Sequence, residues 1–422
     1  MFYKGVVFFA LLSPYFLCAQ LDNYKRITKK LCSSEFHGRG YVNKGDSVAA
    51  IFIAEEFERI GISAIKKKGY KQSFYLDVNT FPGKMTVKLG EKVLTPGIHF
   101  SINEQSGSYS SKLNPKTLSV DTLLDEKLLI ASILKIQENK EGYNSILFNS
   151  SHVGSDTVHK IHYILNQISD IIPVVYVTNK KLMWSVGRQQ LKFPMIEIQD
   201  SVYVKNTSFE VEIESTFIPN YQSQNVIAFL KSKKRRAQTI VVTAHYDHLG
   251  RMGSDTYFAG ANDNASGTAI MLELARYFKN NPIDKNILFI AFGGEEAGLV
   301  GSNYFVNHPL YPLKKIDFLL NIDIMGSGDE GITVVNGVEQ EKAFNLLSEI
   351  NKEHELLKLI KKRGQTSNSD HYWFSTKNVP AIFVYTQGAN KNYHDINDTY
   401  DHLKFDEVDD LLKLFSDFII NY

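Results

Sequence analysis

The sequence predicts an α/β fold in which helices cover both faces of a largely parallel sheet, with a β-rich domain inserted into the chain. After residue 225, short apolar runs alternate with amphipathic segments. The runs are apolar along their whole length, which is typical of parallel strands buried on both faces. Ligands in such sheets bind beyond the carboxyl ends of the strands. We therefore expect a functional site among the residues that follow these runs.

The expected elements follow in chain order. The segment 22–65 has apolar residues at helical spacing and a stop at Gly61, so it predicts a helix packed against the main domain. Short β-like runs separated by Gly, Asn, Ser and Pro come next, at 85–89, 127–130, 145–148, 172–177 and 209–213. Beyond them we expect strands at 239–244, 286–292, 318–322 and 380–385, and helices at 266–278 and 406–420.

The length and the change of texture predict two structural units. A chain of 422 residues exceeds the size at which one core usually keeps growing. We assign residues 20–79 and 222–422 to the main domain and residues 80–221 to the inserted domain. None of the candidate ligand residues described below lies in the insert.

The first 19 residues are expected to be a cleavable export signal. Lys4 precedes an apolar run at 6–12, and small residues precede Gln20. A lipid-anchored Cys18 is the rival interpretation, and the bulky residues 15–17 count against it. We expect an exported protein, periplasmic or secreted. No later run is long and apolar enough for a membrane-spanning helix.

The mature chain is expected to be nearly neutral. Removal of residues 1–19 takes away one of the 47 basic residues and none of the 46 acidic ones, so the numbers of positive and negative side chains become equal. A balanced charge implies neither nucleic acid nor an anionic membrane surface as a partner. Cys32 then remains as the single cysteine, so no internal disulfide can form and stability must come from the core.

Five short stretches, each expected where a buried strand or a turn ends, hold histidines and carboxylates. They are residues 244–247, 262–264, 295–296, 323 and 393–395. Imidazole and carboxylate groups hold zinc and similar metals, and a bridged pair of ions needs one carboxylate that reaches both. Together the stretches predict a metallohydrolase with two Zn²⁺ ions per chain.

His245 and Asp247 form a His-x-Asp pair at the end of an expected strand. This spacing lets the carboxylate accept a hydrogen bond from the ring nitrogen that does not bind metal. His248 could compete as a ligand, but we assign it to the following loop. Asp323 ends another apolar strand, and a buried carboxylate in that position requires a metal or cation partner.

Asp263 lies in a turn rich in Gly and Asn that enters a helix. Those residue types tolerate unusual backbone angles, so the turn can hold Asp263 with one oxygen toward each metal. Glu295 and Glu296 follow a strand through two glycines. Adjacent carboxylates point to different sides, so one can bind metal while the other takes a proton from water.

His394 lies in a loop after the expected strand 380–385. Its imidazole supplies the remaining ligand on these grounds, with Asp395 and His402 as the alternatives.

Six ordered blocks carry a resemblance to a known family. They are AHYDH (244–248), GANDNASG (260–267), GGEEAGLVGS (293–302), NIDIMG (321–326), SDHYWF (369–374) and YHDINDT (393–399). The chain resembles the co-catalytic two-zinc aminopeptidases of the bacterial leucyl aminopeptidase family, which are relatives of glutamate carboxypeptidase II. The resemblance covers about half of the chain and extends to SSEFHGRG (33–40) and KQSF (71–74). It implies the zinc exopeptidase fold, with a single mixed sheet between helices.

The resemblance also implies roles for individual residues. Glu295 would be the general base, beside Asp247, which the His-x-Asp spacing already makes a candidate for orienting the catalytic groups. The implied ligands are His245, Asp263 and Asp323 for one zinc, and Asp263, Glu296 and His394 for the other.

Members of the family often have a tyrosine before the Ser-Asp-His block that steadies the oxyanion, whereas residues 363–368 here contain none. Tyr385 or His371 would then contact the substrate, or the zinc ions would act alone. The insert resembles a degenerate protease-associated domain in the segments 127–130, 143–151 and 172–178.

The sequence therefore predicts a zinc-dependent aminopeptidase that removes amino-terminal residues from peptide substrates, with Glu295 activating a bridging water. Two alternatives stay open. A glutaminyl-peptide cyclotransferase of the same fold works with one zinc and would lack part of the second ligand set. A non-catalytic, receptor-like binding protein would have broken ligands.

Overall fold

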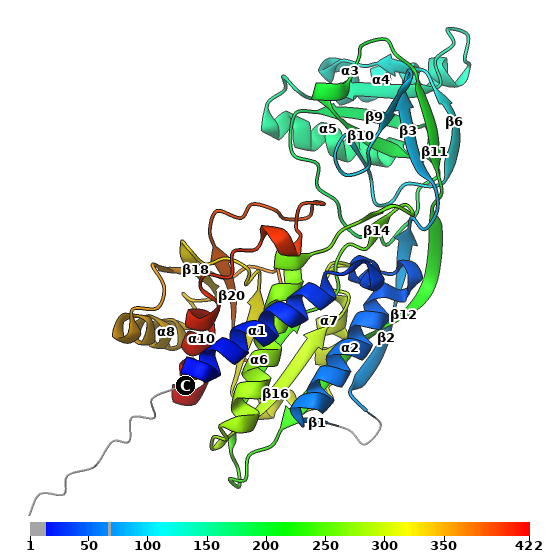
Figure 1. Ribbon diagram of the computed structural model, residues 1–422. Helices are drawn as coiled ribbons and strands as arrows, with labels where there is room; N and C mark the ends of the chain where they lie inside the picture. The colour runs from blue at the N-terminus through cyan, green and yellow to red at the C-terminus, as the bar shows by residue number, and fades with distance from the viewer. Residues whose placement is uncertain (1–13, 66–68) are drawn as a thin grey trace, which may run out of the picture.

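One large sheet organises the computed structural model, which describes residues 14–65 and 69–422 (Figure 1). The first 13 residues of the expected export signal lie outside these ranges. Within the described residues the sheet has nine strands in the order β1-β12-β16-β13-β17-β20-β18-β19, and β2 also pairs with β12. They span Ser63–Ala64 (β1), Lys71–Thr80 (β2), Thr216–Leu230 (β12), Gln238–His245 (β13), Lys285–Phe292 (β16), Phe318–Asp323 (β17), Gly331–Val335 (β18), Ile360–Lys362 (β19) and Ala381–Gln387 (β20).

The centre of this sheet is parallel and its flanks are antiparallel. β16, β13, β17 and β20 run in the same direction, while β12 opposes β16 and β18 opposes β20. The mixed, largely parallel sheet is confirmed, and the four strands expected after residue 225 form its parallel part. The apolar runs that predicted them are buried on both faces, because helices lie on either side.

Two helical layers enclose the sheet, and side chains alternate between them. Along β13, Ile240 and Val242 pack into one layer and Val241 into the other. The first layer contains α1 (Pro14–Leu31), α2 (Gly45–Ile60), α6 (Gly267–Asn280), α8 (Glu341–His354) and α10 (Val408–Asn421). The second contains α7 (Val300–Asn307) and α9 (His371–Thr376).

The helices expected at 266–278 and 406–420 are confirmed. A continuous helix over 22–65 is wrong, because α1 and α2 are separate and short 3₁₀ turns lie between them. The break contains serine, glycine and asparagine, which favour turns over helix.

Residues 85–213 form two smaller sheets that lie apart from the large one, in the upper part of Figure 1. One has the order β5-β10-β9-β8-β7 and the other β4-β3-β11-β6. The strands span Met85–Leu89 (β3), Lys92–Leu94 (β4), Phe100–Ile102 (β5), Tyr109–Leu113 (β6), Pro115–Thr117 (β7), Ser145–Asn149 (β8), Val174–Thr178 (β9), Met195–Gln199 (β10) and Phe209–Ile213 (β11). We call this segment the insert.

The β-rich insert also contains helices. Three helices pack on its five-stranded sheet: α3 (Val120–Leu124), α4 (Glu126–Gln137) and α5 (Ser155–Ile168). The strand expected at 127–130 is wrong, because these residues lie inside α4. The side chain of Asp125 accepts a hydrogen bond from the backbone N–H of Leu128, and Leu129, Ile133 and Ile136 are buried at helical spacing.

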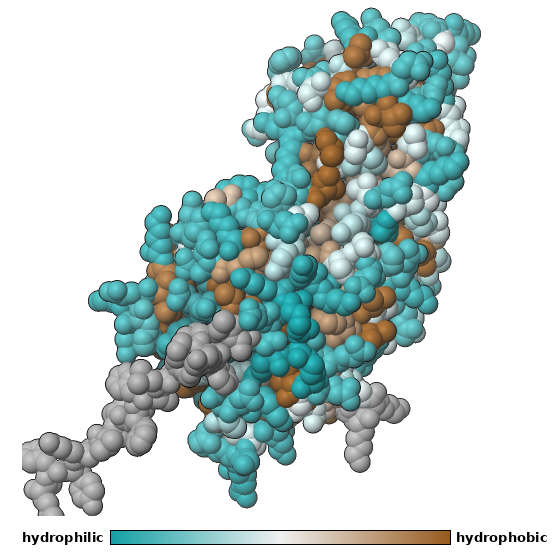
Figure 2. Space-filling view, viewed as in Figure 1, coloured by the Kyte–Doolittle hydropathy of each residue, from teal (hydrophilic) through white to brown (hydrophobic). Residues whose placement is uncertain are grey.

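Figure 2 shows hydrophobic residues gathered over the insert, while α1 and α2 present a mostly hydrophilic surface. Four exposed apolar side chains on α3 and α4 contribute to this difference: Leu124, Leu128, Ile130 and Leu134. Among the described residues, no helix has both the length and the apolar character needed to cross a membrane.

Candidate metal centre

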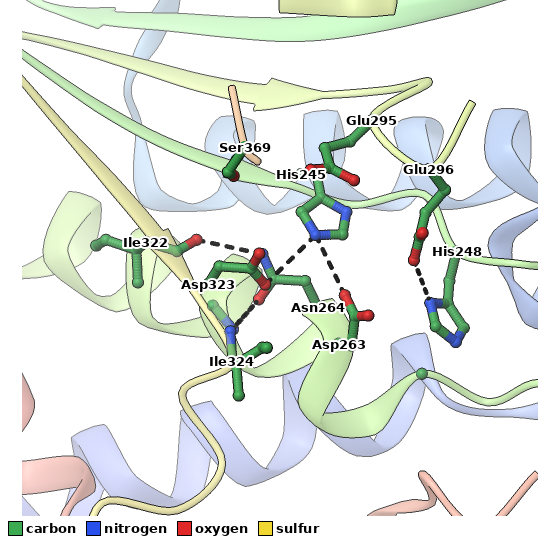
Figure 3. Close-up of polar contacts among 12 residues, drawn as sticks. His245, His248, Asp263, Asn264, Glu295, Glu296, Ile322, Asp323, Ile324 and Ser369 are labelled. Atoms are coloured by element: carbon green, nitrogen blue, oxygen red, sulfur yellow. Dashed lines mark hydrogen bonds and ion pairs between the residues drawn. The ribbon is translucent and has the colours of Figure 1, made fainter. Parts of the chain in front are cut away.

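The expected ligand residues converge at one edge of the large sheet, and Figure 3 shows His245, Asp263, Glu296 and Asp323 there. His245 ends β13, Asp323 ends β17, and Glu295 and Glu296 follow β16. They meet because the carboxyl ends of neighbouring parallel strands lie at the same edge. They line a cavity of about 220 Å³ together with Asp263, Ile324, Arg363, Asn368, Phe383, Tyr385, Tyr393 and His394.

Asp263 lies between two histidines and offers a different oxygen to each. Its Oδ1 is 3.2 Å from Nε2 of His245, and its Oδ2 is 3.2 Å from Nε2 of His394. Asp323 Oδ1 lies 3.4 Å from the same nitrogen of His245, and Glu296 Oε2 lies 3.1 Å from Nε2 of His394. One buried carboxylate thus faces two groups of donors, as a bridged pair of metal ions requires.

His248 is a functional candidate that the sequence analysis assigned to a loop. The side chain is fully buried, and its Nδ1 lies 2.8 Å from Oε1 of Glu296. His248, Asp263 and Glu296 also satisfy the geometry of a three-residue metal group. Its ring therefore either competes with His394 as a ligand or fixes the orientation of Glu296. The signal that could have revealed it was its position directly after the His-x-Asp pair.

Asp247 supports the site in a different way from the one expected. The ring nitrogen Nδ1 of His245 lies 3.2 Å from the backbone oxygen of Asp247 but 3.9 Å from its carboxylate. The carboxylate instead accepts hydrogen bonds from the backbone N–H groups of Glu295 and Glu296, at 3.1 and 3.3 Å. The side chain of Asp247 therefore fixes the start of the loop that carries both glutamates.

The buried carboxylates create a field that favours positive charge. Burial alone would lower the pKa of His245, but the charges of Asp323 and Glu295 raise it well above its usual value. Burial would also lower the pKa of His394, yet the charge of Glu296 and a hydrogen bond to Asp263 raise it to about 11. Both histidines are therefore held in the charged form in the absence of any other cation.

The pKa values of the remaining carboxylates shift in opposite directions. Burial would raise the pKa of Glu296, but the charge of His394 and the contact with His248 lower it to about 2. Burial raises the pKa of Asp323 to about 6, against the opposing charge of His245. Burial also raises the pKa of Glu295 well above its usual value. Among these three carboxylates, Glu295 is therefore the one whose charged form is stabilised least by a neighbouring positive charge.

The donor set fits two zinc-type ions. Imidazole nitrogens and carboxylate oxygens are the usual ligands of zinc in catalytic sites. Asp323 Oδ1 is buried and has no hydrogen-bond donor among the described residues, so it has capacity for a metal. The two groups share Asp263 and leave the carboxylate of Glu295 facing the cavity.

A buried arginine holds the turn that carries Asp263. Arg39 is fully buried, and its guanidinium donates hydrogen bonds of 2.6–3.3 Å to five backbone carbonyls. The acceptors are the carbonyl groups of Leu31, Tyr246, Ala259, Gly260 and Asp263. Five fixed donors in a plane suit this role. The sequence analysis quoted the block 33–40 only as part of the resemblance and gave Arg39 no role.

Close backbone contact brings Arg39 to this position. A Cβ atom on Gly40 would lie 2.4 Å from the Cα of Gly250, so only glycine permits the approach. From the other side, the two carboxylate oxygens of Asp398 accept hydrogen bonds from the N–H groups of Asn262 and Asp263, at 2.8 and 3.0 Å. The turn is therefore held through both its carbonyl and its amide groups.

The insert contacts the loop that carries His394. The backbone N–H of Trp184 donates to the carbonyl of His394 at 3.0 Å. The ammonium group of Lys181 donates to the carbonyls of Lys391 and Tyr393, at 2.8 and 3.1 Å, and pairs with the buried carboxylate of Asp395. A long loop is thus fixed at its functional end by residues from another part of the chain.

The two expected substrate contacts are placed differently. Tyr385 lines the cavity, and its hydroxyl accepts a hydrogen bond of 3.2 Å from Arg363 Nη1. His371 is fully buried, packs against the ring of Phe383 with centroids 5.3 Å apart, and is not among the side chains that line the cavity. Burial lowers the pKa of His371 to about 4, which keeps its ring neutral.

Comparison with known proteins places this site in a family. Residues 225–419, which include every expected metal ligand, match the model of Peptidase family M28. Just under half of the chain is therefore similar to this family. This confirms the resemblance that the six sequence blocks carry. The matched region begins after the insert, so the likeness of the insert to a protease-associated domain stays a prediction.

Individual relatives in the family are similar over part of their length. Aminopeptidase YwaD of Bacillus subtilis (strain 168) is 43% identical over 123 residues, which are 29% of this chain and 26% of that protein. A probable lipoprotein aminopeptidase, LpqL, of Mycobacterium tuberculosis is 32% identical over 152 residues, 35% of this chain and 29% of that protein. The chain therefore matches about a quarter of the length of these curated relatives.

Solved structures match the fold over nearly the whole chain. The crystal structure of BSAP, a zinc aminopeptidase from Bacillus subtilis, aligns with a TM-score of 0.69 and 19% identity and covers 94% of each chain. An aminopeptidase from Aneurinibacillus sp. strain AM-1 aligns with a TM-score of 0.62 and 19% identity, over 94% of this chain and 93% of that one. The insert is therefore within the region of shared fold.

Replacement of Arg39 by lysine is expected to destabilise the protein and weaken metal binding. A lysine keeps the charge but cannot reach five carbonyls, so buried acceptors lose their donors. We expect the free energy of unfolding to fall by on the order of 3 kcal/mol, measured by urea denaturation. The control is Arg235→Lys at an exposed loop position. Equal stability of the two variants would contradict the role given to Arg39.

Replacement of Lys181 by methionine is expected to weaken the second metal site selectively. Without the ammonium group, the loop of His394 loses its contacts with Lys181 and keeps only the hydrogen bond from the backbone of Trp184. Loss of such supporting contacts costs roughly tenfold in metal affinity. Stepwise zinc titration in a calorimeter, starting from the metal-free protein, resolves the weaker binding step. Lys180→Met removes a neighbouring exposed charge and serves as the control. The role fails if both variants bind the second ion equally tightly.

Proposed function

We propose that this protein is a zinc-dependent aminopeptidase that hydrolyses amino-terminal residues from peptides. The observation that carries the proposal is the placement of Asp263, whose two oxygens face His245 and His394 separately. His245, Asp263 and Asp323 would hold one ion, and Asp263, Glu296 and His394 the other. The aminopeptidase names of the relatives support the same reaction.

His394 is the better candidate for the second ion than His248. Nε2 of His394 faces both Asp263 and Glu296. Nδ1 of His248 lies close to Oε1 of Glu296, the oxygen that does not face His394. His248 would then orient Glu296, as a hydrogen-bond partner behind a ligand does.

Two bound zinc ions would supply a polarised substrate carbonyl and a more acidic water. Side chains of the protein would supply proton transfer, positioning and stabilisation of the developing negative charge. Glu295, which extends into the cavity, takes a proton from the attacking water and returns it to the leaving amine. Asp247 holds the backbone of Glu295 at the position that this proton transfer needs. Tyr385, on the cavity wall, is placed to donate a hydrogen bond to the carbonyl oxygen as negative charge develops there.

The cavity favours removal of single residues from a chain end. Its volume of about 220 Å³ is below the roughly 300–1,000 Å³ of ordinary small-molecule sites. The acidic side chains at its base would attract a free amino terminus. A complete second donor group counts against a one-zinc cyclotransferase, and intact ligands count against a non-catalytic receptor.

We also assign a role to each part of the chain. Residues 20–79 and 222–422 would form the peptidase domain, and residues 80–221 an inserted domain that supports the loop of His394. Residues 1–19 would direct export and be removed.

The proposal is tested by metal content and turnover of purified residues 20–422. Wild type should contain close to two zinc ions and cleave aminoacyl-anilides. Glu295→Gln should keep its zinc and lose at least about a thousandfold in kcat, because the proton acceptor is gone. Glu55→Gln, at an exposed position on α2, is the matched control and should behave as wild type.

Removal of metal provides an independent check. Dialysis against a chelator should abolish turnover, and two equivalents of zinc per chain should be needed to restore it fully. Full recovery with one equivalent, together with cyclisation of amino-terminal glutamine, would instead identify a cyclotransferase. Two bound ions without turnover on any peptide would favour a binding protein.

A further inference from the structure

Arg363 is a basic side chain on the wall of an otherwise acidic and aromatic cavity. Among the described residues that line the cavity, it is the single arginine or lysine. The sequence analysis located no basic residue near the site. It lines the same cavity as four carboxylates, so the lining carries both signs of charge.

The backbone of Arg363 is fixed, although its side chain is exposed. Arg363 directly follows β19, and its N–H donates to the carbonyl of Val334 at 2.9 Å. Its carbonyl accepts a hydrogen bond of 3.4 Å from the N–H of Val338. The side chain therefore starts from an anchored position at the end of a sheet strand and reaches into the cavity from there.

The guanidinium has unused binding capacity. Its one recorded hydrogen bond is donated by Nη1 to the hydroxyl of Tyr385 at 3.2 Å. Within residues 14–65 and 69–422, no carboxylate forms an ion pair with it. A guanidinium carries five donors in a planar fork that matches a carboxylate, so most of its donors remain available to a ligand.

The small volume restricts which part of a substrate can reach this group. A cavity of about 220 Å³ holds roughly one residue, so a group bound by Arg363 belongs to the amino-terminal residue or its immediate neighbour. Tyr385 lies beside Arg363, and Asn368 lines the same cavity with polar atoms suited to an oxygen ligand. Phe383 and Tyr393 add aromatic rings to the lining.

We propose that Arg363 makes this cavity selective for substrates that carry a carboxylate on or next to the amino-terminal residue. This selectivity rests on the proposed function, which places the free amine of the substrate at the carboxylates that line the cavity. The carboxylate can come from an aspartate or glutamate side chain at the amino terminus or from the C-terminus of a dipeptide. Arg363 binds it with a bidentate, charge-assisted pair of hydrogen bonds, while the hydroxyl of Tyr385 accepts a further hydrogen bond from the guanidinium.

The test compares matched substrates that differ only in the carboxylate. Glu-anilide against Gln-anilide reports on the side chain, and Leu-Leu against Leu-Leu-amide reports on the C-terminus. In zinc-loaded wild type, kcat/KM should favour the acidic member of at least one pair by roughly tenfold or more. Arg363→Met should reduce that ratio to near one, whereas Lys361→Met, an exposed position on β19, should preserve it.

The pair that responds identifies the source of the carboxylate. An equal loss on both members of each pair would overturn the proposal, because Arg363 would then act only by holding Tyr385. Unchanged ratios in Arg363→Met would overturn it as well.

Calorimetric binding of free glutamate against glutamine to the zinc-loaded protein separates this proposal from the proposed function. It needs no turnover, and tighter binding of glutamate that disappears in Arg363→Met would support the proposal even if the anilides are not cleaved. Suppose that both amino acids bind equally and that the kcat/KM ratios of the matched substrates are the same in wild type and Arg363→Met. The protein would then be an aminopeptidase without this selectivity.

Discussion

The shared carboxylate of Asp263 is the constraint on which the rest of the structure depends. A single buried side chain can serve two cation positions only if its backbone cannot rotate, since each oxygen must face its own histidine. The fold meets this requirement with Arg39, which binds carbonyls around the turn, and Asp398, which binds its amides. Both supporting side chains are buried.

The sheet and the insert supply the remaining geometry. Parallel strands β13 and β17 end side by side and deliver His245 and Asp323 to one edge, so these two ligands are placed by the core itself. His394 has no such support, because it lies in a loop beyond β20. Lys181 and Trp184 from the insert hold that loop. A domain far from the sheet core thereby contributes to the second half of the candidate site without providing a ligand.

The sequence predicted the features that a local pattern of residues determines. It did not predict the features that depend on contacts between distant parts of the chain. Apolar runs gave the strands of the large sheet, and strand-end histidines and carboxylates gave a ligand set that the fold brings together. The run 127–130 was misassigned to a strand, because three consecutive apolar residues fit either period and the cap at Asp125 decides for helix. Arg39 and Lys181 could not be assigned roles, because most of their partners lie more than 200 residues away. Arg363 was missed because strands β18 and β19, whose pairing brings it to the cavity, were not predicted.

The most direct test of the central claim is anomalous diffraction at the zinc absorption edge from crystals of the zinc-loaded protein. The account predicts two peaks about 3.5–4 Å apart, with one oxygen of Asp263 bound to each ion. His245 and Asp323 should complete the first coordination group, and Glu296 and His394 the second. A single peak, or two peaks that do not share Asp263, would contradict the account.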